Sequence, residues 1–498
     1  MGIRFHELGR QYPKCILPYN EKPIIVPNLH RILDIEQLET ITIVVKHQAQ
    51  KIIDTVTMYF PEEVKNEKIN FRFYAKINGN SGPLVSINHG IIDRKNSLLV
   101  ILSDILLESS LVLESSFVSC KKVDDYERWC MVEEKENLNF YDKVKERPPT
   151  TLALSGIYYF QNAGRLVDLM DDLFNNLKDK EPQISHILSL YQQFEKLQLK
   201  SVSIIDFGTL EEYEENRLER RSRIFNVVEE VGYKVIKRSR EKRAKIIEEF
   251  NWYNSMPSKI QQYLPRIYDS NTKDELSDST WYSLERIRFP TLREWYLFLE
   301  SDVKFWDKVF DKLFGILDTF YETNNLGETF LEELFTKTVL RIEQLPPEYK
   351  DNDFLTRMKK IKSSKHDTLF HGDMCFSNIF FDDKTDEVKL IDPRGNIQGN
   401  VLYDYAKLMT SIIYDYDFID AHLYTENNGD YKLFNSGKEK IKELFLVKLN
   451  KKFDKETIQL ITILAANLFL TMIPLHSESP TNQKLFYECY KRALKDAT

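Results

Sequence analysis

The segment His371–Gly395, which reads HGDMCFSNIFFDDKTDEVKLIDPRG, contains side chains whose types and spacing suit phosphoryl transfer. Asp373 and Asn378 have four residues between them, a polar hairpin follows, and Asp392 closes its second strand. Phosphoryl transfer needs a carboxylate that receives the substrate hydroxyl proton, and oxygen ligands that hold Mg²⁺ on the nucleotide phosphates. An Asp and an Asn at this spacing let one loop aim the first at the nucleophile and the second at the metal. The alternative, a surface loop with Asp and Asn as turn formers, leaves the combination unexplained.

This segment resembles the aminoglycoside phosphotransferase/choline kinase family, whose loop reads HGD-x4-N and is followed by a strand ending in ID. The resemblance implies that Asp373 is the catalytic base and that Asn378 and Asp392 are Mg²⁺ ligands. It also implies that His371 supports the loop. Asp404, in YDYAKL, matches a position that braces the catalytic loop, so we expect an architectural role for it.

The segment upstream should then supply a small ATP-binding lobe. Val235–Ser239 (VIKRS) predicts a short strand with a lysine near its end. Lys237 is the best candidate for the lysine that contacts the phosphates, and Glu249 on the next helix is its candidate ion-pair partner. Lys234 and Glu248 are close competitors, and surface charge is the alternative for all four.

Two further features of this lobe follow from the resemblance. Trp281–Ile287 (WYSLERI) looks like the hinge between the lobes, where backbone groups around Leu284 would hold adenine. Ser222–Gly232 contains one glycine where kinases carry a glycine-rich loop, so no phosphate contact is assigned there.

The chain opens with MGIRFHELGRQYPKCILPYNEKPII. The spacing resembles the signature of sugar-phosphate nucleotidyltransferases, G-x-G-x-R followed by PK-x-hLP-hydrophobic-x-x-KP, at Gly2, Arg4, Pro13, Lys14, Pro18, Lys22 and Pro23. The resemblance implies that a short glycine turn at Gly2 lets backbone N–H groups approach a triphosphate, and that Arg4 and Lys14 neutralise the phosphates as pyrophosphate leaves. The alternative is a basic loop with turn-forming prolines.

Later positions agree with this resemblance. LVILSD is an apolar strand that ends in Asp104, and VSIIDFGTLEEY matches the second metal motif at Asp206. The resemblance implies that both carboxylates bind Mg²⁺ and that Gly82, in NGNSGPLVSI, binds the base or the sugar. The stretch DKVKERPPTTLALSGIYYF resembles the substrate-binding segment, with Lys143 as the sugar-phosphate lysine, Lys145 as its rival, and Gly156 in the strand.

One departure concerns the start of the chain. In this family an apolar strand precedes the glycine turn and lies centrally in the sheet, whereas Met1 is already inside that turn. Either the true start lies upstream of Met1, or the domain is weakened and its transferase activity impaired. We expect the former.

The pattern along the chain predicts an α/β protein with two domains. From Ile41 to about Asp206, short apolar runs alternate with helical patterns, which favours a mainly parallel sheet covered by helices. With the resemblances, we expect a doubly wound, Rossmann-like nucleotidyltransferase domain (GT-A-like) over residues 1–218. A two-lobed, protein-kinase-like α+β domain follows over 219–498, with a small lobe at about 219–290 and a helical lobe at about 291–498.

Composition limits the partners and the location. The chain has 498 residues and a net charge of -8, so nothing draws it as a whole to nucleic acid or to an anionic membrane. The five cysteines are widely spaced and include no CxxC pair, which favours a reducing cytosol and a cytoplasmic protein. The sequence does not indicate an oligomeric state.

Together the resemblances predict a bifunctional, Mg²⁺-dependent enzyme. It would phosphorylate a small alcohol (a sugar, alditol or amino alcohol) with ATP. It would then transfer a nucleotidyl group from CTP or another NTP to such a phosphate, giving an activated precursor for cell-surface polysaccharide. One alternative is a choline/ethanolamine kinase joined to a phosphocholine cytidylyltransferase. Another is a nucleotide-binding regulatory protein with one active site. A protein kinase is disfavoured because no APE-like anchor follows Asp392.

Overall fold

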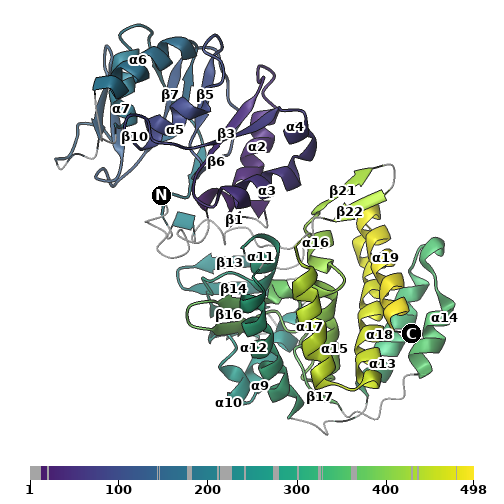
Figure 1. The fold of residues 1–498 in the computed structure, drawn as a ribbon. Coiled ribbons are helices and arrows are strands. Elements are labelled where there is room, and N and C mark those ends of the chain that lie inside the picture. Colours follow the sequence, from purple (N-terminus) through teal and green to yellow (C-terminus); the bar gives the residue numbers. More distant parts are fainter. Residues whose placement is uncertain are drawn as a thin grey trace. The chain divides into compact units, whose positions relative to one another are not determined.

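The chain folds into two compact units, Met1–Arg217 and Leu218–Thr498, whose boundary is one residue from the expected one. The structure is a computed structural model. It describes residues 13–19, 22–142, 144, 146–176, 182–209, 212–213, 227–239, 243–272, 280–299, 302–322, 327, 329–360, 367–427, 430–433, 437–477 and 479–497. Both units combine helices and strands, which confirms the expected α/β class (Figure 1).

The largest sheet of the first unit has the strand order β11-β7-β10-β8-β9, and β5 also pairs with β10, at Ile157–Phe160 on the edge opposite β7. Its strands are β5 (Leu98–Ile101), β7 (Phe117–Lys122), β8 (Cys130–Glu134), β9 (Leu138–Asp142), β10 (Leu152–Phe160) and β11 (Gln198–Ser201). β10 runs antiparallel to β5, β7 and β8, so the expectation of a mainly parallel sheet is wrong here. The apolar pattern of a strand does not encode its direction, and the short β8–β9 connection can only join antiparallel strands.

Parallel pairing occurs between β3 (Ile41–Val45) and β4 (Ile69–Phe73). The helices of this region are α2 (Ile25–Leu33), α3 (Ala49–Tyr59) and α4 (Pro61–Lys65), which lie beside β3 (Figure 1). Val45, Ile52 and Val56 form part of their shared core. The remaining elements of the unit are the 3-10 helix η2 (Lys14–Ile16), β1 (Pro18–Tyr19), β2 (Lys22–Pro23), α5 (Pro83–Gly90), β6 (Ile105–Leu107), α6 (Ala163–Asn176), α7 (Ile184–Tyr191) and β12 (Ile204–Asp206).

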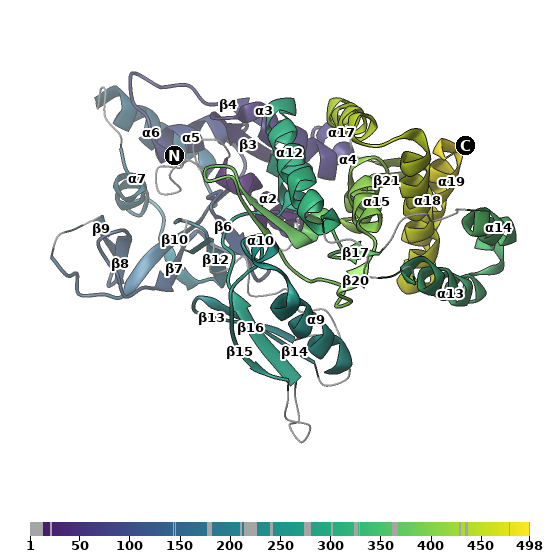
Figure 2. The same cartoon turned by 90° about the horizontal axis from the view of Figure 1, so that it is seen from below.

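The second unit begins with a small lobe around an antiparallel sheet of order β13-β14-β16-β15. Its strands are β13 (Val227–Val231), β14 (Lys234–Ser239), β15 (Ile267–Asn271) and β16 (Thr280–Glu285). Helix α9 (Arg243–Ser255) packs against β14 and β16, and Figure 2 shows it along that sheet. Short helix α10 (Ser258–Gln261) follows α9.

The helical lobe is built around α18 (Lys455–Met472), which packs against α13 (Phe330–Glu343), α15 (Val401–Ile412) and α19 (Pro480–Asp496). Its other helices are α11 (Leu292–Glu294), the π-helix η3 (Trp295–Leu299), α12 (Val303–Tyr321), η4 (Pro347–Tyr349), α14 (Asn352–Lys360), η5 (Phe376–Asn378), α16 (Tyr416–Asp420), α17 (Glu439–Lys452) and η6 (Ile473–His476). Its strands pair as β17 (Thr368–Leu369) with β20 (Gln398–Gly399), β18 (Ile379–Asp382) with β19 (Glu387–Leu390), and β21 (Tyr424–Asn427) with β22 (Asp430–Leu433).

One helical segment among the described residues, Lys455–His476, is long and apolar enough to cross a membrane. That finding rests on length and composition alone and is weak evidence, because 61% of its most apolar window is buried inside the protein. Its packing against three other helices accounts for its hydrophobicity as that of a core helix.

Candidate functional sites

The β18–β19 hairpin brings the three residues of the expected kinase site together. Ile379 pairs with Leu390, and the Ile391 N–H donates to the Asn378 carbonyl oxygen at 3.0 Å. This register places Asn378 and Asp392 at the same end of the hairpin. The Asn378 Nδ2 donates to both the carbonyl oxygen and Oδ2 of Asp373, each at 3.0 Å.

Asp404 on α15 holds the backbone of the loop that begins at His371. Its Oδ2 accepts from the His371 N–H at 2.8 Å and its Oδ1 from the Gly372 N–H at 2.7 Å. Burial raises the pKa of Asp404 to about 7, against the lowering effect of these two donors. Burial lowers the pKa of His371 to about 4, so the imidazole is neutral at pH 7. Gly372 has φ +82°, and a Cβ there would lie 2.6 Å from the Arg394 Cβ.

Lys237 joins the small lobe to the catalytic hairpin. Its Nζ donates to Glu249 Oε2 at 2.6 Å and to Asp392 Oδ1 at 3.0 Å. Burial would lower the Lys237 pKa, but the two carboxylates together outweigh that effect and the pKa is raised. Of the competitors, Lys234 pairs instead with the exposed Asp269, and Glu248 is exposed.

The donor set of this site fits Mg²⁺. Asp392 and Asn378 offer a carboxylate and an amide oxygen, which are the hard ligands that Mg²⁺ takes. The Asp392 side chain is 48% exposed, and its backbone has φ +55°, in the left-handed region. Within the described residues no group of three or more His, Cys, Asp or Glu forms a metal cage. Such a sparse set suits a Mg²⁺ that also binds water and nucleotide phosphates.

The sequence reasoning missed Lys407. Its Nζ lies 2.9 Å from Asp373 Oδ1, and its side chain is 17% exposed. Burial lowers its pKa, but the Asp373 carboxylate outweighs that effect and the pKa is raised. The sequence contained a signal that could have predicted this contact. Lys407 follows Asp404 by three residues and therefore lies on the same face of the helix.

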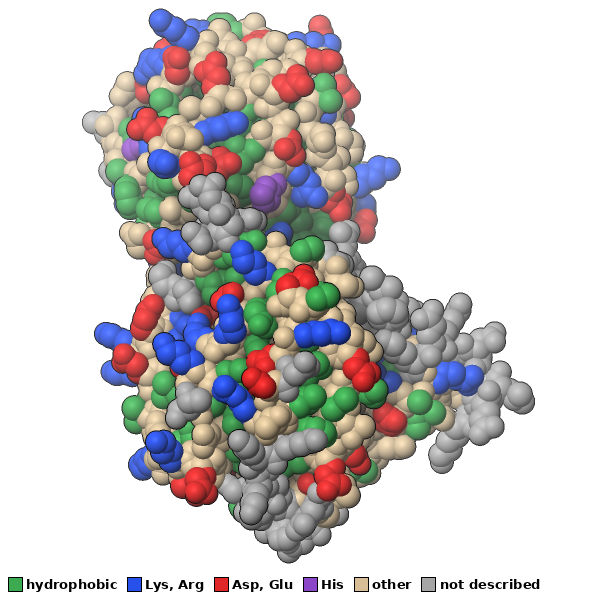
Figure 3. All heavy atoms as spheres, turned by 90° about the vertical axis from the view of Figure 1, so that its right-hand side faces the viewer, with side chains coloured by type: hydrophobic (Ala, Val, Ile, Leu, Met, Phe, Trp, Pro, Cys, Tyr) green, Lys and Arg blue, Asp and Glu red, His purple; other side chains and the backbone are tan. Residues whose placement is uncertain are grey.

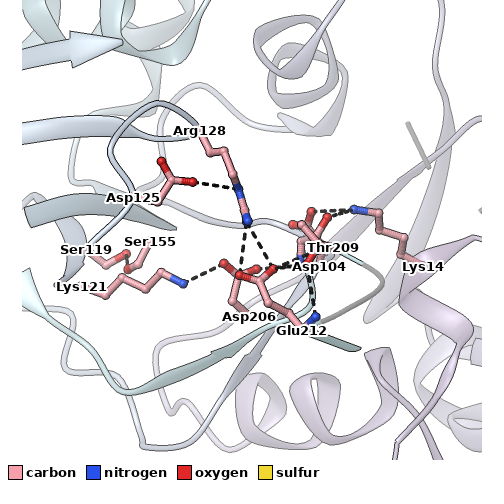
Figure 4. A network of polar contacts seen from close by, with 11 residues as sticks. Lys14, Asp104, Ser119, Lys121, Asp125, Arg128, Ser155, Asp206, Thr209 and Glu212 are labelled. Carbon is pink, nitrogen blue, oxygen red and sulfur yellow. Dashed lines mark hydrogen bonds and ion pairs between the residues drawn. The ribbon is translucent and has the colours of Figure 1, made fainter. Parts of the chain in front are cut away.

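In the first unit, the β6–β12 pair brings together the two expected metal carboxylates. Asp206 pairs with Ile105, and the Phe207 N–H donates to the Asp104 carbonyl oxygen at 2.8 Å. The buried Asn28 of α2 fastens β6 by donating to the Ile105 carbonyl and accepting from the Leu107 N–H. Figure 4 shows the two carboxylates in one network of polar contacts.

Each of the two carboxylates forms an ion pair with a lysine side chain. Lys14 of η2 lies 3.6 Å from Asp104 Oδ2 and donates to the Gly208 carbonyl oxygen at 2.8 Å. Lys121 of β7 donates to Asp206 Oδ2 at 2.7 Å, and its ammonium lies 4.1 Å from the centre of the Trp129 ring. Carboxylate oxygens are the hard ligands that Mg²⁺ takes, so Asp104 and Asp206 are a donor set that fits it.

The motif after Asp206 is organised by a third carboxylate that sequence reasoning did not single out. Glu212 Oε2 accepts from the backbone N–H and the hydroxyl of Thr209, at 3.0 and 2.9 Å. Arg128 donates to Glu212 at 3.2 Å (Figure 4). Lys121 and Arg128 belong to no motif recognised in the sequence, and only the fold brings them to this site.

Comparison with solved structures found similar proteins of two kinds. No protein-family model and no curated protein matches the chain. Solved structures that are similar to it include a nucleoside-diphosphate-sugar pyrophosphorylase from Vibrio cholerae (12% identity, 43% of this chain and 96% of that chain, TM-score 0.36). They also include a choline/ethanolamine kinase family protein from Mesorhizobium loti (10% identity, 55% and 85%, TM-score 0.36). A third is the GDP complex of aminoglycoside 2'-phosphotransferase-IIIa (11% identity, 56% and 91%, TM-score 0.39).

These are the two kinds of protein that the sequence motifs resemble. Each match covers about half of this chain, at 10–12% identity.

The other predicted residues fall into two groups. Gly2, Arg4, Lys143 and its rival Lys145 lie outside the described residues. Three others are placed. Gly82 has φ +103° and precedes α5, and its N–H donates to the Tyr74 hydroxyl oxygen at 3.1 Å. Gly156 has φ +94° and is buried in β10, where the Leu102 side chain fills the space beside it. Leu284 is buried in β16 opposite Val235.

Proposed function

We propose that this chain is a bifunctional enzyme, with a small-molecule kinase in the second unit and a nucleotidyltransferase in the first. The observation that carries the kinase proposal is the convergence on one loop of a carboxylate, a metal-type ligand pair and two lysines. Asp373 accepts the proton of the acceptor hydroxyl, and Lys237 contacts the ATP phosphates. Asn378 and Asp392 would hold Mg²⁺, which neutralises phosphate charge when bound.

The nucleotidyltransferase proposal rests on the carboxylates Asp104 and Asp206, each paired with a lysine. In this reaction a phosphate oxygen of the substrate attacks the α-phosphorus of an NTP, and pyrophosphate leaves. Lys14 and Lys121 place positive charge where phosphate charge develops, which stabilises the transition state electrostatically. The two carboxylates would hold Mg²⁺, which supplies further positive charge when bound.

The two reactions form a sequence, because the product of a kinase is the kind of phosphate that a nucleotidyltransferase activates. The kinase uses ATP, the transferase uses CTP or another NTP, and the product would be a cytoplasmic precursor of a cell-surface polymer. Choline or ethanolamine as the acceptor remains a second candidate. On the surface that Figure 3 shows, basic and acidic side chains are interspersed, which supports neither a nucleic-acid nor a membrane partner.

The proposal is tested with the full chain, Mg²⁺, ATP, each NTP and a panel of small alcohols, by measuring ADP and pyrophosphate release. Asp373→Ala should abolish ADP release and spare pyrophosphate release from a supplied phosphate. Asp206→Ala should do the reverse. Asp307→Ala, at a half-exposed carboxylate of α12 that pairs with Lys448, is the matched control and should change neither. Loss of both activities in either single variant would contradict two independent sites. Activity of one unit only would favour the regulatory alternative.

A further inference from the structure

Two cations, Lys407 and Arg394, contact the loop that begins at His371, and a third, Lys337, lies close enough for their charges to lower its pKa. We call Lys337, Arg394 and Lys407 the basic cluster. Lys407 is the member that touches the proposed catalytic base, at 2.9 Å from Asp373 Oδ1. The backbone of Arg394 lies beside the same loop, because its N–H donates to the His371 carbonyl oxygen at 2.9 Å.

The Arg394 guanidinium lies between α13 and α15. It is 5.7 Å from the ring centre of Phe330, the first residue of α13, and 5.6 Å from that of Tyr403, one turn before Lys407 on α15. Its Nη1 is buried without a hydrogen-bond partner, and no carboxylate among the described residues pairs with this side chain. Aromatic faces stabilise a guanidinium but do not neutralise its charge.

Lys337 on α13 adds a second positive charge to that of Arg394. It lies seven residues after Phe330, two turns along the same face of the helix. It too has no ion-pair partner among the described residues. Its pKa is lowered to about 8, first by partial loss of hydration of the ammonium and then by the positive charges of Arg394, Arg341, Lys407 and Lys245. Cations that depress each other's protonation are stabilised when an anion binds between them.

The basic cluster comes from other elements than the lysine that we assign to the ATP phosphates, although Lys245 of α9 in the small lobe also lies near enough to lower the Lys337 pKa. Lys237, which we assign to the ATP phosphates, comes from strand β14 of the small lobe. Lys337 and Lys407 come from helices of the helical lobe, and Arg394 follows the hairpin that carries Asp392. Asp373 lies where the acceptor hydroxyl must be, so the neighbouring cations on the helical side face the rest of the acceptor molecule.

We propose that the kinase acceptor is an anionic alcohol, a compound that carries a phosphate or carboxylate group near its reacting hydroxyl, and that Arg394 and Lys337 bind this anionic group. The inference rests on the proposed kinase function of the second unit. In the reaction the acceptor oxygen forms a bond to the γ-phosphorus of ATP, and the bond to the β,γ-bridging oxygen breaks. The electron pair leaves with ADP, and the hydroxyl proton passes to Asp373. A quaternary ammonium such as choline would be repelled by the same two cations.

The test measures ADP release by the full chain with three classes of alcohol. The anionic class includes glycerol 3-phosphate and glycerate, which distinguish phosphate from carboxylate on one carbon skeleton. Glycerol and alditols form the neutral class, and choline and ethanolamine form the cationic class. We expect the best acceptor to be anionic, with kcat/KM at least about tenfold above that of its neutral counterpart. If a neutral or cationic alcohol is best, the inference is wrong and the kinase function stands. If no alcohol supports ADP release, the kinase function itself fails.

Charge-removing variants locate the anion. Arg394→Gln and Lys337→Gln should each raise KM for the best anionic acceptor about tenfold, with KM for ATP within about twofold of the wild-type value. Lys337 is exposed, so its replacement keeps the test informative if the Arg394 variant does not fold. Lys491→Gln, at an exposed lysine of α19 that pairs with Glu488, is the matched control and should change neither KM. A rise in KM for ATP alone would assign the cations to the nucleotide and overturn the inference.

Discussion

The buried ion pair between Lys237 and Glu249 gives the sharpest test of the kinase site. The two residues are 7% and 1% exposed, and their side chains meet at 2.6 Å. Lys237→Met removes the ammonium and leaves the Glu249 carboxylate buried beside the Tyr282 hydroxyl, with Lys245 at 3.7 Å as its remaining cation. Removing one partner of a buried pair costs about 3–5 kcal/mol. That is a large fraction of the roughly 5–15 kcal/mol that stabilises a typical domain.

A second substitution separates stability from chemistry. Glu249→Gln in the Lys237→Met background removes the unpaired charge and keeps an acceptor for Tyr282, so we expect it to recover most of the lost stability. Kinase activity should stay absent in both variants, because no ammonium remains to contact the ATP phosphates. The control is Lys234→Met, which removes a lysine paired with the exposed Asp269 and should leave the urea midpoint close to that of the wild type.

The assay is urea unfolding followed by tryptophan fluorescence, together with ADP release. Four of the five tryptophans lie in the second unit, so the fluorescence reports mainly on it. If Lys237→Met is as stable as the wild type, the pair is not buried as described. If the double variant is no more stable than the single one, the loss does not come from the unpaired carboxylate. If the double variant phosphorylates an alcohol, Lys237 does not bind the phosphates.

Three further predictions follow from individual residues. Because His371 is buried and its pKa is lowered from 6.5 to about 4, the unfolded chain binds more protons between these values. The contribution of His371 to the stability of the second unit should therefore fall by about 3 kcal/mol between pH 6.5 and pH 4, opposite in sign to that of Asp404, whose raised pKa favours the folded state on acidification. The free energy of unfolding of the wild type minus that of His371→Asn, measured by urea unfolding at each pH, should fall by this amount over that range. Gly372→Ala should destabilise the unit by about 1–3 kcal/mol and slow ADP release while sparing pyrophosphate release, since φ is +82° and a Cβ would meet the Arg394 Cβ; an unchanged urea midpoint would contradict this. Lys121→Met should slow pyrophosphate release at least about tenfold, and equal rates in variant and wild type would remove Lys121 from the transferase site.

The kinase residues were the part of the site most open to prediction from sequence. Asp373, Asn378 and Asp392 lie within one loop and hairpin, so short-range spacing fixes their geometry. Asp104 and Asp206 are far apart in the sequence, but each lies beside a strand, and pairing of those strands brings them together.

Other parts depended on tertiary contacts that no local pattern encodes. Lys121 lies on β7, an interior strand of a different sheet, and pairs with Asp206. Arg128 pairs with Glu212 from the loop before β8. Strand direction was also beyond prediction, because alternating apolar segments look alike in parallel and antiparallel sheets. Lys407 was also missed, although its spacing of three residues from Asp404 was a local signal that places it on the same face of the helix.

The position of Asp404 and Lys407 on one turn of α15 has a consequence for how the proposed kinase would lose activity on heating. The same helix holds the loop backbone and supplies the charge beside the base, and it is buried against α12 and α18 rather than at an edge of the lobe. A helix in that position does not fray locally; it melts with the core around it. Phosphorylation should therefore switch off as an all-or-none event at the melting of the helical lobe, with little gradual decline below that temperature. A thermal shift of that lobe would then be read directly as a shift in the working range of the enzyme.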